Sequence, residues 1–321
     1  MRTPFIEDDL SMLRRHYDVD AFIGSGVASA LAVFRRAIAA DVSISWFASV
    51  YTFFMVVAAR MQHRPTVILL GGVDTARDDR IGYGIWRSAW RRPLLRWTLR
   101  HATRIYAVDA SLATALAASS GISDLDVRVL PTGYDSDFWT PGDDERRGVL
   151  LVAGCRTRDR FLVKGVDVYI EAARRMSDVP FVLIGTSSDL LAHVATPANL
   201  TIIPSIERPF LREHYRRAAV YCQPSRHEGL PNSLCEAMLC GCIPVGARAG
   251  GVADAIGDCG IVVMPGDVDA LASAILSALS KSASDTSASS RACSRARIIE
   301  RYPADRREKK LIEAIDEMLD A

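Results

Sequence analysis

The sequence lacks cysteine pairs of the kind that hold metal ions or build a disulfide framework. All seven cysteines lie from Cys155 onward, their number is odd, and no CxxC spacing occurs. Cys240 and Cys242 flank a single glycine, which is too little for a metal site by itself. This pattern favours a reduced, cytoplasmic protein with buried thiols over a disulfide framework or a zinc site.

Charge of one sign is not in excess either. The 39 Lys and Arg residues nearly balance the 38 Asp and Glu residues, leaving a formal net charge of +1. Such a balance gives no global attraction to nucleic acid, so electrostatic recognition is expected to be local. The opening MRTPFIEDDL has no apolar segment of the signal-peptide type, and we expect no signal peptide.

Long hydrophobic runs are scarce, with one exception at residues 42–59. This segment carries no charged residue. Its length of 18 residues is near the lower limit for a helix that crosses a bilayer. Its first half alternates like a buried strand, and its second half has helical spacing diluted by polar residues such as Ser49 and Thr52. We predict a strand followed by a core helix, with a membrane helix as the alternative.

Short β-branched runs that alternate with helix-like stretches make up most of the chain. The expected strands lie at residues 20–24, 41–47, 66–72, 104–108, 127–131, 148–154, 180–185, 200–204, 219–223, 243–247 and 260–264. Such alternation predicts an α/β protein with two doubly wound parallel sheets. The Ser-rich residues 280–290 are expected to form a solvated loop.

A polar, turn-rich connector at residues 139–147 separates the two series of strands. We therefore predict one domain at 1–141 and another at 148–302. The helix at 303–321 is a candidate to pack back on the first domain. Ligands of parallel sheets bind beyond the carboxyl ends of the strands, so the loops after the strands are where a site is expected.

The loop after the strand at 148–154 is rich in cations. Arg156, Arg158, Arg160 and Lys164 crowd together just before a helix-like stretch. A solvated surface would look the same. Cations at the carboxyl edge of a sheet, leading into a helix amino terminus, also suit a phosphate group.

Two carboxylates flank a turn in the stretch RHEGLPNSLCEAMLCGCIPV, residues 226–245. The sequence from Ser233 to Glu236 fits a capping box, which would give Glu236 a structural role. No helix needs Glu228, whereas Gly229 would let a ligand approach the backbone, and the amides of residues 229–233 can face a phosphate. Carboxylates can accept hydrogen bonds from the hydroxyl groups of a sugar and a ribose, and the turn between them can bind the diphosphate. This combination suits a nucleotide sugar.

The segment from Lys164-Gly165-Val-Asp167 through residues 226–245 to GGVADAIGDCGIVVMPGDVDALASAI resembles the donor domain of family 4 of the retaining glycosyltransferases. The amino-terminal half matches more loosely, through VILLGGVD and VRVLPTGYDSDFW. The resemblance implies the GT-B fold, in which two Rossmann-like domains face a central cleft. It also implies a transferase that moves a sugar from a nucleoside diphosphate.

The family pattern assigns roles to particular residues of this sequence. Lys164 and a nearby arginine would neutralise the departing diphosphate, Glu236 would hold the ribose, and Glu228 would hold the donor sugar. The implied catalytic residues are Lys164, Arg160 and Glu228, and the implied donor-binding residues are Arg156, Ile206, Gly229, Leu230, Pro231, Asn232, Ser233 and Glu236.

The sequence departs from the family pattern at three places. The first strand is missing or very short, because the chain begins almost at a helix. Asp159 stands where an arginine is expected, which makes Arg160 the preferred partner of Lys164. The usual acceptor-domain histidine is absent, and Gly71, Gly72 and Asp74 are the candidates on the acceptor side, with a structural turn aspartate as the alternative.

The resemblance thus predicts a metal-independent, retaining hexosyltransferase without a cofactor. Its donor would be a nucleoside diphosphate sugar, with uridine as the favoured base, and its acceptor a glycan or a lipid-linked sugar. The alternatives are a GT-B sugar epimerase and an inactive nucleotide-sugar-binding module. A remote alternative is an NAD-dependent oxidoreductase. It is suggested by FIGSGVAS, residues 22–29, which nearly matches the dinucleotide-binding fingerprint.

Residues 84–104 contain many cations, no acid and three tryptophans, Trp86, Trp90 and Trp97. The tryptophans would share one helical stripe, although Pro93 breaks a single long helix. The simplest interpretation is a core helix with a solvated basic face. Peripheral attachment to anionic lipid at the inner face of the membrane is the alternative.

Overall fold

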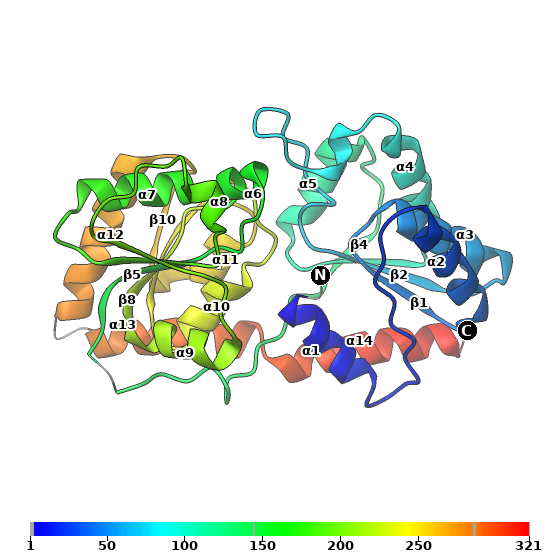
Figure 1. The fold of residues 1–321 in the computed structure, drawn as a ribbon. Helices are drawn as coiled ribbons and strands as arrows, with labels where there is room; N and C mark the ends of the chain where they lie inside the picture. The colour runs from blue at the N-terminus through cyan, green and yellow to red at the C-terminus, as the bar shows by residue number, and fades with distance from the viewer. Residues whose placement is uncertain (1–2, 144, 285–286, 321) are drawn as a thin grey trace. The chain divides into compact units, whose positions relative to one another are not determined.

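The computed structural model describes residues 3–143, 145–284 and 287–320, and Figure 1 shows the chain as a ribbon. Contacts divide the chain into two compact units. One contains the residues up to Gly133 together with those from Ala304 onward, and the other is Tyr134–Pro303. The division therefore lies earlier than the connector at 139–147, and the last helix belongs to the first unit.

The first unit is built on a parallel sheet with the strand order β1-β2-β3-β4. Its strands are β1 (Ser43–Trp46), β2 (Thr66–Leu70), β3 (Arg104–Ala107) and β4 (Val127–Val129). Its helices are α1 (Pro4–Leu13), α2 (Val27–Ala39), α3 (Val50–Met61), η1 (Ile85–Arg87), α4 (Arg91–His101), α5 (Ser111–Ser120) and α14 (Ala304–Leu319). The strand order does not reverse within this sheet.

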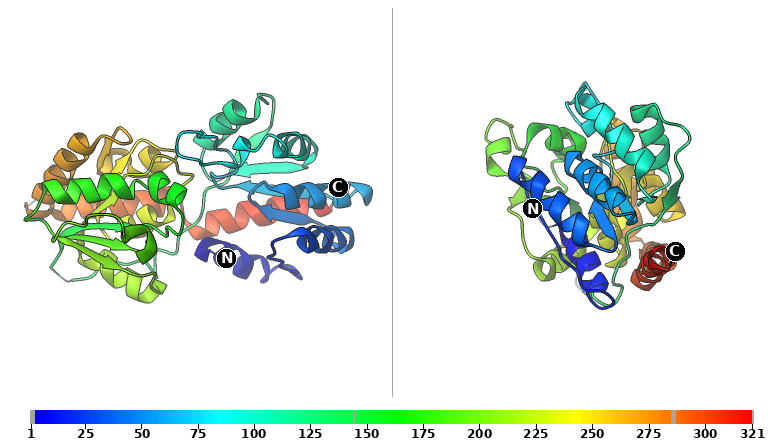
Figure 2. Two further views of the ribbon diagram at one scale, coloured as in Figure 1. Left: turned by 45° about the horizontal axis from the view of Figure 1, so that its top comes forward. Right: turned by 90° about the vertical axis from the view of Figure 1, so that its right-hand side faces the viewer.

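Alternation along β2 places helices on both faces of the first sheet. Val67 and Leu69 pack against α1 and α14, whereas Ile68 and Leu70 pack against α4 and α5. Successive side chains of a strand point to opposite faces, so a fully apolar β2 is covered on both sides. Helices α1 and α14, from the two ends of the sequence, lie side by side (Figure 2).

A buried ion pair joins α1 to α14. The guanidinium of Arg307 donates to both carboxylate oxygens of Asp9, at 2.7 and 2.6 Å. Both side chains are almost fully buried, and Asp9 also accepts from the indole of Trp46 at 2.9 Å. Removing one partner of such a pair leaves an uncompensated buried charge, so α14 is firmly part of the first unit.

Two expectations for the first unit have clear outcomes. The strand predicted at residues 20–24 is wrong, because this segment has no regular secondary structure and leads through Gly26 into α2. The uncharged run at 42–59 forms β1 and most of α3, which confirms the strand and core helix. Every helix in residues 3–143, 145–284 and 287–320 is too short or too polar to span a bilayer.

The second unit contains a larger parallel sheet with the order β10-β9-β8-β5-β6-β7. Its strands are β5 (Arg147–Val152), β6 (Phe181–Ile184), β7 (Leu200–Ile203), β8 (Ala218–Gln223), β9 (Ile243–Ala247) and β10 (Ile261–Val263). Its helices are α6 (Arg158–Val163), α7 (Val166–Arg175), α8 (Ser188–Leu191), α9 (Arg208–Arg217), α10 (Asn232–Leu239), α11 (Val252–Ile256), η2 (Gly257–Cys259), α12 (Val268–Ala283) and α13 (Ser287–Arg301). This sheet is doubly wound, because the order reverses between β5 and β8.

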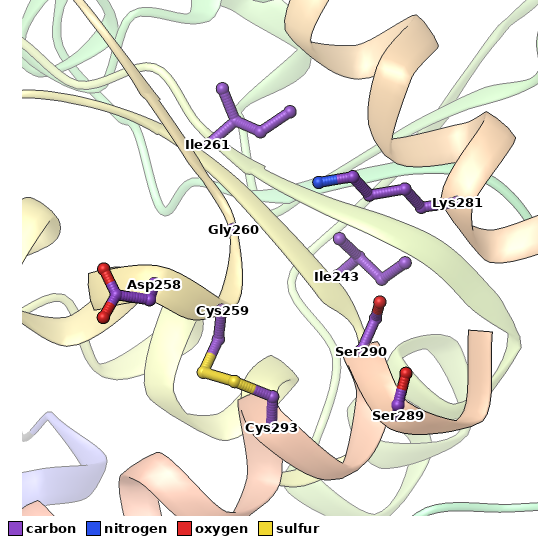
Figure 3. Close-up of a pocket in the computed structure, with 9 residues that line it drawn as sticks. All are labelled: Ile243, Asp258, Cys259, Gly260, Ile261, Lys281, Ser289, Ser290 and Cys293. Carbon is purple, nitrogen blue, oxygen red and sulfur yellow. A yellow bond between two sulfur atoms is a disulfide. The ribbon is translucent and has the colours of Figure 1, made fainter. Parts of the chain in front are cut away.

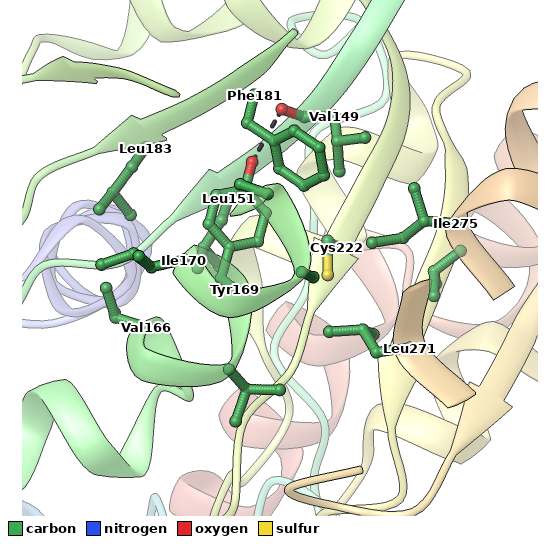
Figure 4. Packing of buried hydrophobic residues seen from close by; sticks show 14 of the residues in the cluster. Val149, Leu151, Val166, Tyr169, Ile170, Phe181, Leu183, Cys222, Leu271 and Ile275 are labelled. Carbon is green, nitrogen blue, oxygen red and sulfur yellow. Dashed lines mark hydrogen bonds between the residues drawn. The ribbon is translucent and has the colours of Figure 1, made fainter. Parts of the chain in front are cut away.

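The core of the second unit lies between its sheet and the helices α7 and α12 (Figure 4). Tyr169 of α7 stacks edge-on against Phe181 of β6 with ring centroids 5.2 Å apart. Its hydroxyl donates to the carbonyl oxygens of Val149 and Val182, at 2.8 and 2.9 Å. Full burial of a large apolar side chain contributes about 1.5–3 kcal/mol, so this layer fixes α7 and the loop that precedes it.

The expectation that all cysteines are reduced is wrong for one pair. Cys259 in η2 and Cys293 in α13 form a disulfide across 34 residues of sequence, while the other five cysteines are free and buried. Spacing could not reveal the pair, because packing of α13 against η2 brings the two residues together. Figure 3 shows the disulfide lining a surface pocket with Lys281 and Ser290, and no predicted site residue lines that pocket.

The solvated loop predicted at 280–290 is also largely wrong. Residues up to Ala283 continue α12, and α13 begins at Ser287. Residues 285–286 lie outside the described part of the chain. Serine lowers helix propensity by only a few tenths of a kcal/mol, so a Ser-rich composition does not prevent a helix whose other side chains pack on the unit.

Candidate functional site

The predicted site residues gather at the carboxyl ends of β5 and β8, the neighbouring strands between which the strand order reverses. The loops that follow these strands leave in opposite directions, which is the position where doubly wound sheets bind ligands. The loop after β5 leads into α6, and the loop after β8 leads into α10. The residues that the sequence singled out therefore lie at one edge of this sheet, around the carboxyl ends of β5 and β8.

An ion pair between Lys164 and Glu228 joins the two loops. The Lys164 ammonium lies 2.7 Å from Oε1 of Glu228, and the two side chains are 23% and 8% exposed. Oε1 of Glu228 also accepts from the Ser225 hydroxyl at 2.7 Å and from the Gln223 amide at 2.9 Å. Three donors on one carboxylate oxygen fix its orientation, because charge-assisted hydrogen bonds are the stronger kind.

The position of Lys164 depends on the glycine that follows it. Gly165 has a φ of 66°, in the left-handed region, and it lies where α6 ends and α7 begins. A Cβ at this position would lie 2.1 Å from the carbonyl oxygen of Pro224. Only glycine lets the backbone take this conformation and approach the end of β8 so closely.

The basic segment is a helix rather than the loop that we predicted, because α6 begins at Arg158 itself. Arg156 precedes this helix and is exposed, Arg158 lies over the ring of Phe161, and Arg160 is half-buried. These charged side chains also affect the pKa of the buried Cys155 thiol. Burial raises its pKa to about 11, while Lys164 and Arg160 act to lower it and Glu228 acts to raise it.

The capping box predicted between Ser233 and Glu236 is wrong. Helix α10 begins at Asn232, two residues earlier than that motif requires, and its N-cap residue is Pro231, which has no capping side chain. Ser233 instead lies 3.5 Å from the Gln223 amide oxygen. Glu236 accepts a hydrogen bond from the buried Tyr215 hydroxyl at 3.1 Å, and burial raises the pKa of Tyr215 well above its usual value.

The turn between the two glutamates is held from behind by the loop after β9. The backbone of Gly251 donates to the carbonyl oxygen of Gly229 at 2.8 Å. Gly250 has a φ of 52°, and a Cβ there would lie 2.0 Å from the carbonyl oxygen of Glu228. The backbone of the turn is thus fixed before any ligand binds, and Leu230 and Pro231 within it are buried.

Two further predicted donor residues, Asn232 and Ile206, lie in different parts of the second unit. Asn232 accepts a hydrogen bond from the Tyr134 hydroxyl at 2.8 Å, so its side chain connects α10 to the start of this unit. Ile206 is half-buried in the loop between β7 and α9, two strands away from β5. The structure therefore brings Lys164, Glu228 and the turn together, and it places Ile206 farther along the same edge.

Sequence reasoning missed Gln223 and Ser225, which hold the Glu228 carboxylate together with Lys164. Both side chains are fully buried. A signal was available, because a glutamine ends an otherwise apolar strand immediately before the loop that carries Glu228. A buried amide at the functional edge of a sheet needs partners, and the nearest polar groups were those of the site.

The acceptor-side candidates lie in the first unit. Asp74 is completely buried, and its carboxylate accepts from the backbone amides of Gly71, Gly72 and Ala48 at 3.1, 2.9 and 3.0 Å. Burial raises the pKa of Asp74 despite these hydrogen bonds. Such contacts are those of an aspartate that fixes the turn after β2.

Residues 84–104 do not form the single stripe that we predicted. Trp86 lies before α4, is fully buried, and donates to the carbonyl oxygen of Asp74 at 2.7 Å. Trp97 stacks on His101 with ring centroids 4.2 Å apart, and only Trp90 of the three is well exposed, at 61%. The structure also removes the support for a dinucleotide fingerprint, because residues 20–24 do not form the required strand.

Residues 148–281 match the family model described as glycosyl transferases group 1. Over 205 residues the chain is 26% identical to an MMP alpha-(1->4)-mannosyltransferase of Mycolicibacterium hassiacum, covering 57% of this chain and 49% of that protein. Over 211 residues it is 30% identical to a D-inositol 3-phosphate glycosyltransferase of Geodermatophilus obscurus, covering 56% of this chain and 46% of that protein. The chain spans about half the length of the curated relatives it matches.

Solved structures extend the likeness over nearly the whole chain. HepE of Anabaena in complex with UDP has a TM-score of 0.71 at 16% identity, covering 96% of this chain and 89% of that one. Sucrose-phosphate synthase of Thermosynechococcus elongatus has a TM-score of 0.73 at 16% identity, covering 90% of this chain and 76% of that one. At such identities the likeness establishes the fold, which is GT-B.

Proposed function

We propose that this chain, which belongs with the family 4 glycosyltransferases of the GT-B fold through its group 1 domain, transfers a sugar from a nucleoside diphosphate sugar to an acceptor. The main support for this proposal is the ion pair between Lys164 and Glu228, whose Nζ and Oε1 atoms lie 2.7 Å apart near the start of α10. It combines a cation for a diphosphate with a carboxylate for hydroxyl groups, at the edge of the sheet where ligands bind.

The proposed roles follow from the chemistry of each group. The ammonium of Lys164, which follows α6, and the guanidinium of Arg160 in α6 would stabilise the charge that grows on the departing diphosphate. The turn from Gly229 to Ser233 would offer backbone amides to a phosphate. Glu228 would accept hydrogen bonds from donor-sugar hydroxyls, and Glu236 from the ribose.

We infer a hexose donor linked to UDP and retention of anomeric configuration. The similarity to HepE, whose solved structures contain UDP or UDP-glucose, supports uridine as the base. Retention, a glycan or lipid-linked acceptor and independence from metal ions rest on the family pattern and on the cations beside Glu228. Glu228 is already engaged by Lys164, so Lys164 rather than a metal ion is the proposed partner of the donor's charge.

The decisive experiment measures release of nucleoside diphosphate from a panel of nucleotide sugars, with and without simple glycan acceptors. We expect release from a UDP-hexose, and thermal stabilisation by UDP of roughly 2.7 kcal/mol at about 100 times its dissociation constant. Binding without release would favour an inactive module, interconversion of the nucleotide sugar would favour an epimerase, and a response only to NAD would contradict the proposal.

We also propose that the first unit contacts anionic lipid through residues 84–104, which would place the protein at the inner face of the membrane. Exposed Trp90 lies next to the helix α4, whose Arg96 and Arg100 are exposed. An exposed tryptophan beside exposed arginines is a combination that binds membrane interfaces. The buried Trp86 contributes nothing to such a surface.

A further inference from the structure

Gln223 is a buried polar residue at the carboxyl end of β8 that no step of the proposed reaction uses. Its amide nitrogen lies 2.9 Å from Oε1 of Glu228 and 2.8 Å from the Ser225 hydroxyl. Its amide oxygen lies 3.2 Å from the Tyr221 hydroxyl and 3.5 Å from the Ser233 hydroxyl. The two donor positions and two acceptor positions of the amide are therefore all engaged.

The direction of this network is fixed by charge. The nitrogen of the amide has to face Glu228, because its oxygen in that place would oppose a carboxylate oxygen without a proton between them. The oxygen then faces Tyr221, whose hydroxyl accepts from the backbone amide of Val152 at 3.4 Å and donates to Gln223. A chain of hydrogen bonds thus runs from the backbone of β5 through β8 to Glu228.

The network leaves one oxygen of Glu228 for a ligand. Oε1 accepts from Lys164, Ser225 and Gln223, whereas Oε2 takes no hydrogen bond from any residue in the described ranges. A carboxylate whose plane is held through one oxygen presents the other in a fixed direction. Preorganisation of this kind matters for turnover, because a misplacement of about 1 Å can cost on the order of 10²-fold in rate.

We propose that Gln223 is a positioning residue, which holds Glu228 so that its Oε2 receives a hydroxyl of the donor sugar in the transition state. This inference rests on the proposed function, in which Glu228 binds the sugar. Gln223 does not touch the substrate in this role, so all of its effect on turnover passes through Glu228.

A double-mutant cycle tests this dependence. Steady-state kinetics are measured for the wild type, Gln223→Met, Glu228→Ala and the double variant, with a UDP-hexose and an accepted sugar. Methionine has a similar volume and no hydrogen-bond donor, so we expect Gln223→Met to lower kcat about 10- to 100-fold with the donor KM within about twofold. In the Glu228→Ala background the same change should lower kcat by less than about twofold, because coupled residues are not additive.

The matched control is Tyr169→Phe, which removes a buried hydroxyl of the same unit that bonds only to backbone carbonyls (Figure 4). We expect this variant to lose thermal stability and to keep kcat within about twofold of the wild type. If Gln223→Met does not fold, Gln223→Asn replaces it, because it retains the amide but withdraws it from Oε1 by one carbon.

Two further outcomes separate this inference from the function on which it rests. Equal losses of kcat in the two backgrounds, or a raised donor KM with unchanged kcat, would overturn the positioning role while leaving the transferase intact. A wild-type protein that turns over no nucleotide sugar would overturn the proposed function itself. Gln223→Glu should be more damaging than Gln223→Met, since it places a carboxylate oxygen against Glu228; the reverse order contradicts the inference.

Discussion

The two glutamates on either side of the turn that leads into α10 have different surroundings, and these suggest different roles. Glu228 is held through one oxygen by Lys164, Ser225 and Gln223. Glu236 has a contact to the Tyr215 hydroxyl at 3.1 Å and lies one turn into α10. The fixed carboxylate of Glu228 suits a group that acts in the transition state. Glu236 suits a contact with the ribose that is equally strong in the ground state and the transition state.

Lys164→Ala should damage turnover far more than donor affinity. Negative charge on the diphosphate grows as the glycosidic bond breaks, so a fixed ammonium gains most of its interaction energy in the transition state. Loss of one such electrostatic group typically costs about 10² to 10³ in kcat. Steady-state kinetics combined with calorimetric UDP affinity measure both quantities, and a kcat within about threefold of the wild type would remove Lys164 from its role.

Glu236→Ala should weaken donor binding more than it lowers turnover. Ribose contacts change little during the reaction, so we expect the donor KM to rise about tenfold or more and kcat to change little. The Tyr215 hydroxyl also loses its acceptor, which should lower stability by about 1 kcal/mol. Glu236→Gln is the control, because it retains an acceptor for Tyr215; a kcat loss larger than the KM rise would assign Glu236 to the chemical step.

At the scale of elements, the disulfide and the glycines fix how helices meet the sheet of the second unit. Cys259 and Cys293 tie η2 to α13, and η2 follows α11 directly. The amino terminus of α11 begins just after Gly250 and Gly251, which support the backbone of the turn at Gly229. The disulfide therefore stabilises the layer on which the turn rests.

Cys293→Ser should lower the free energy of unfolding without changing the fold. Closing a loop of this length contributes about 2 to 4 kcal/mol in the chain-entropy account. The measurement is denaturant unfolding of the oxidised wild type and the variant. The wild type under reducing conditions should match the variant, and equal stability of all three would show that the disulfide does not form.

Thiol titration provides an independent count. The free cysteines are buried, and burial raises the pKa of Cys155 and Cys242 to about 11, so few thiolates are present near pH 8. We expect no rapid reaction with a thiol reagent in the native protein, five reactive groups after unfolding, and seven after unfolding with a reductant. Seven groups without the reductant would contradict the disulfide.

At the scale of the whole molecule, the two units hold different sets of candidate residues. The second unit holds the predicted donor residues and matches the family model over residues 148–281. The first unit holds the acceptor candidates and residues 84–104. The proposed donor site can therefore be tested by nucleotide binding alone, whereas tests of the proposed acceptor side and of lipid contact involve the first unit.

Activity should be independent of added divalent metal. The proposed site supplies Lys164 to the diphosphate. Each of the four DxD triplets of the sequence has an aspartate that is already paired within the protein, since Asp20 pairs with Arg36 and Asp126 with Arg128. Asp135 accepts the backbone amide of Asp137, and Asp267 caps α12. Turnover with EDTA within about twofold of turnover with magnesium is the expected result; loss with EDTA and recovery with magnesium or manganese would refute it.

Contact with lipid through residues 84–104 should be electrostatic and salt-dependent. Pelleting with vesicles rich in anionic lipid is expected to fall steeply between low and high salt, because exposed charges are screened over about 10 Å at 0.1 M. Trp90→Ala should weaken pelleting, whereas Trp97→Ala serves as the control, because Trp97 is stacked on His101. Salt-independent pelleting, or none, would remove the lipid surface from the proposal.

The sequence by itself determined the α/β class, most strands, and the edge of the second sheet at which the candidate residues lie. These features depend on local periodicity and on which residues lie in the segments between a strand and the next long helix, as Lys164 and Glu228 show. The strand predicted at 20–24 does not form, because Phe22 and Ile23 stay exposed and these residues pair with no described strand.

Only the tertiary structure decided which residues hold the Lys164–Glu228 ion pair and how the two ends of the chain pack together. Gln223, the Cys259–Cys293 disulfide and the Arg307–Asp9 ion pair join elements that are separate in sequence. Whether Ser233 caps a helix or faces Gln223 depends on a shift of two residues at the start of α10. Such contacts are set by packing between elements, which periodicity and spacing along one chain do not specify.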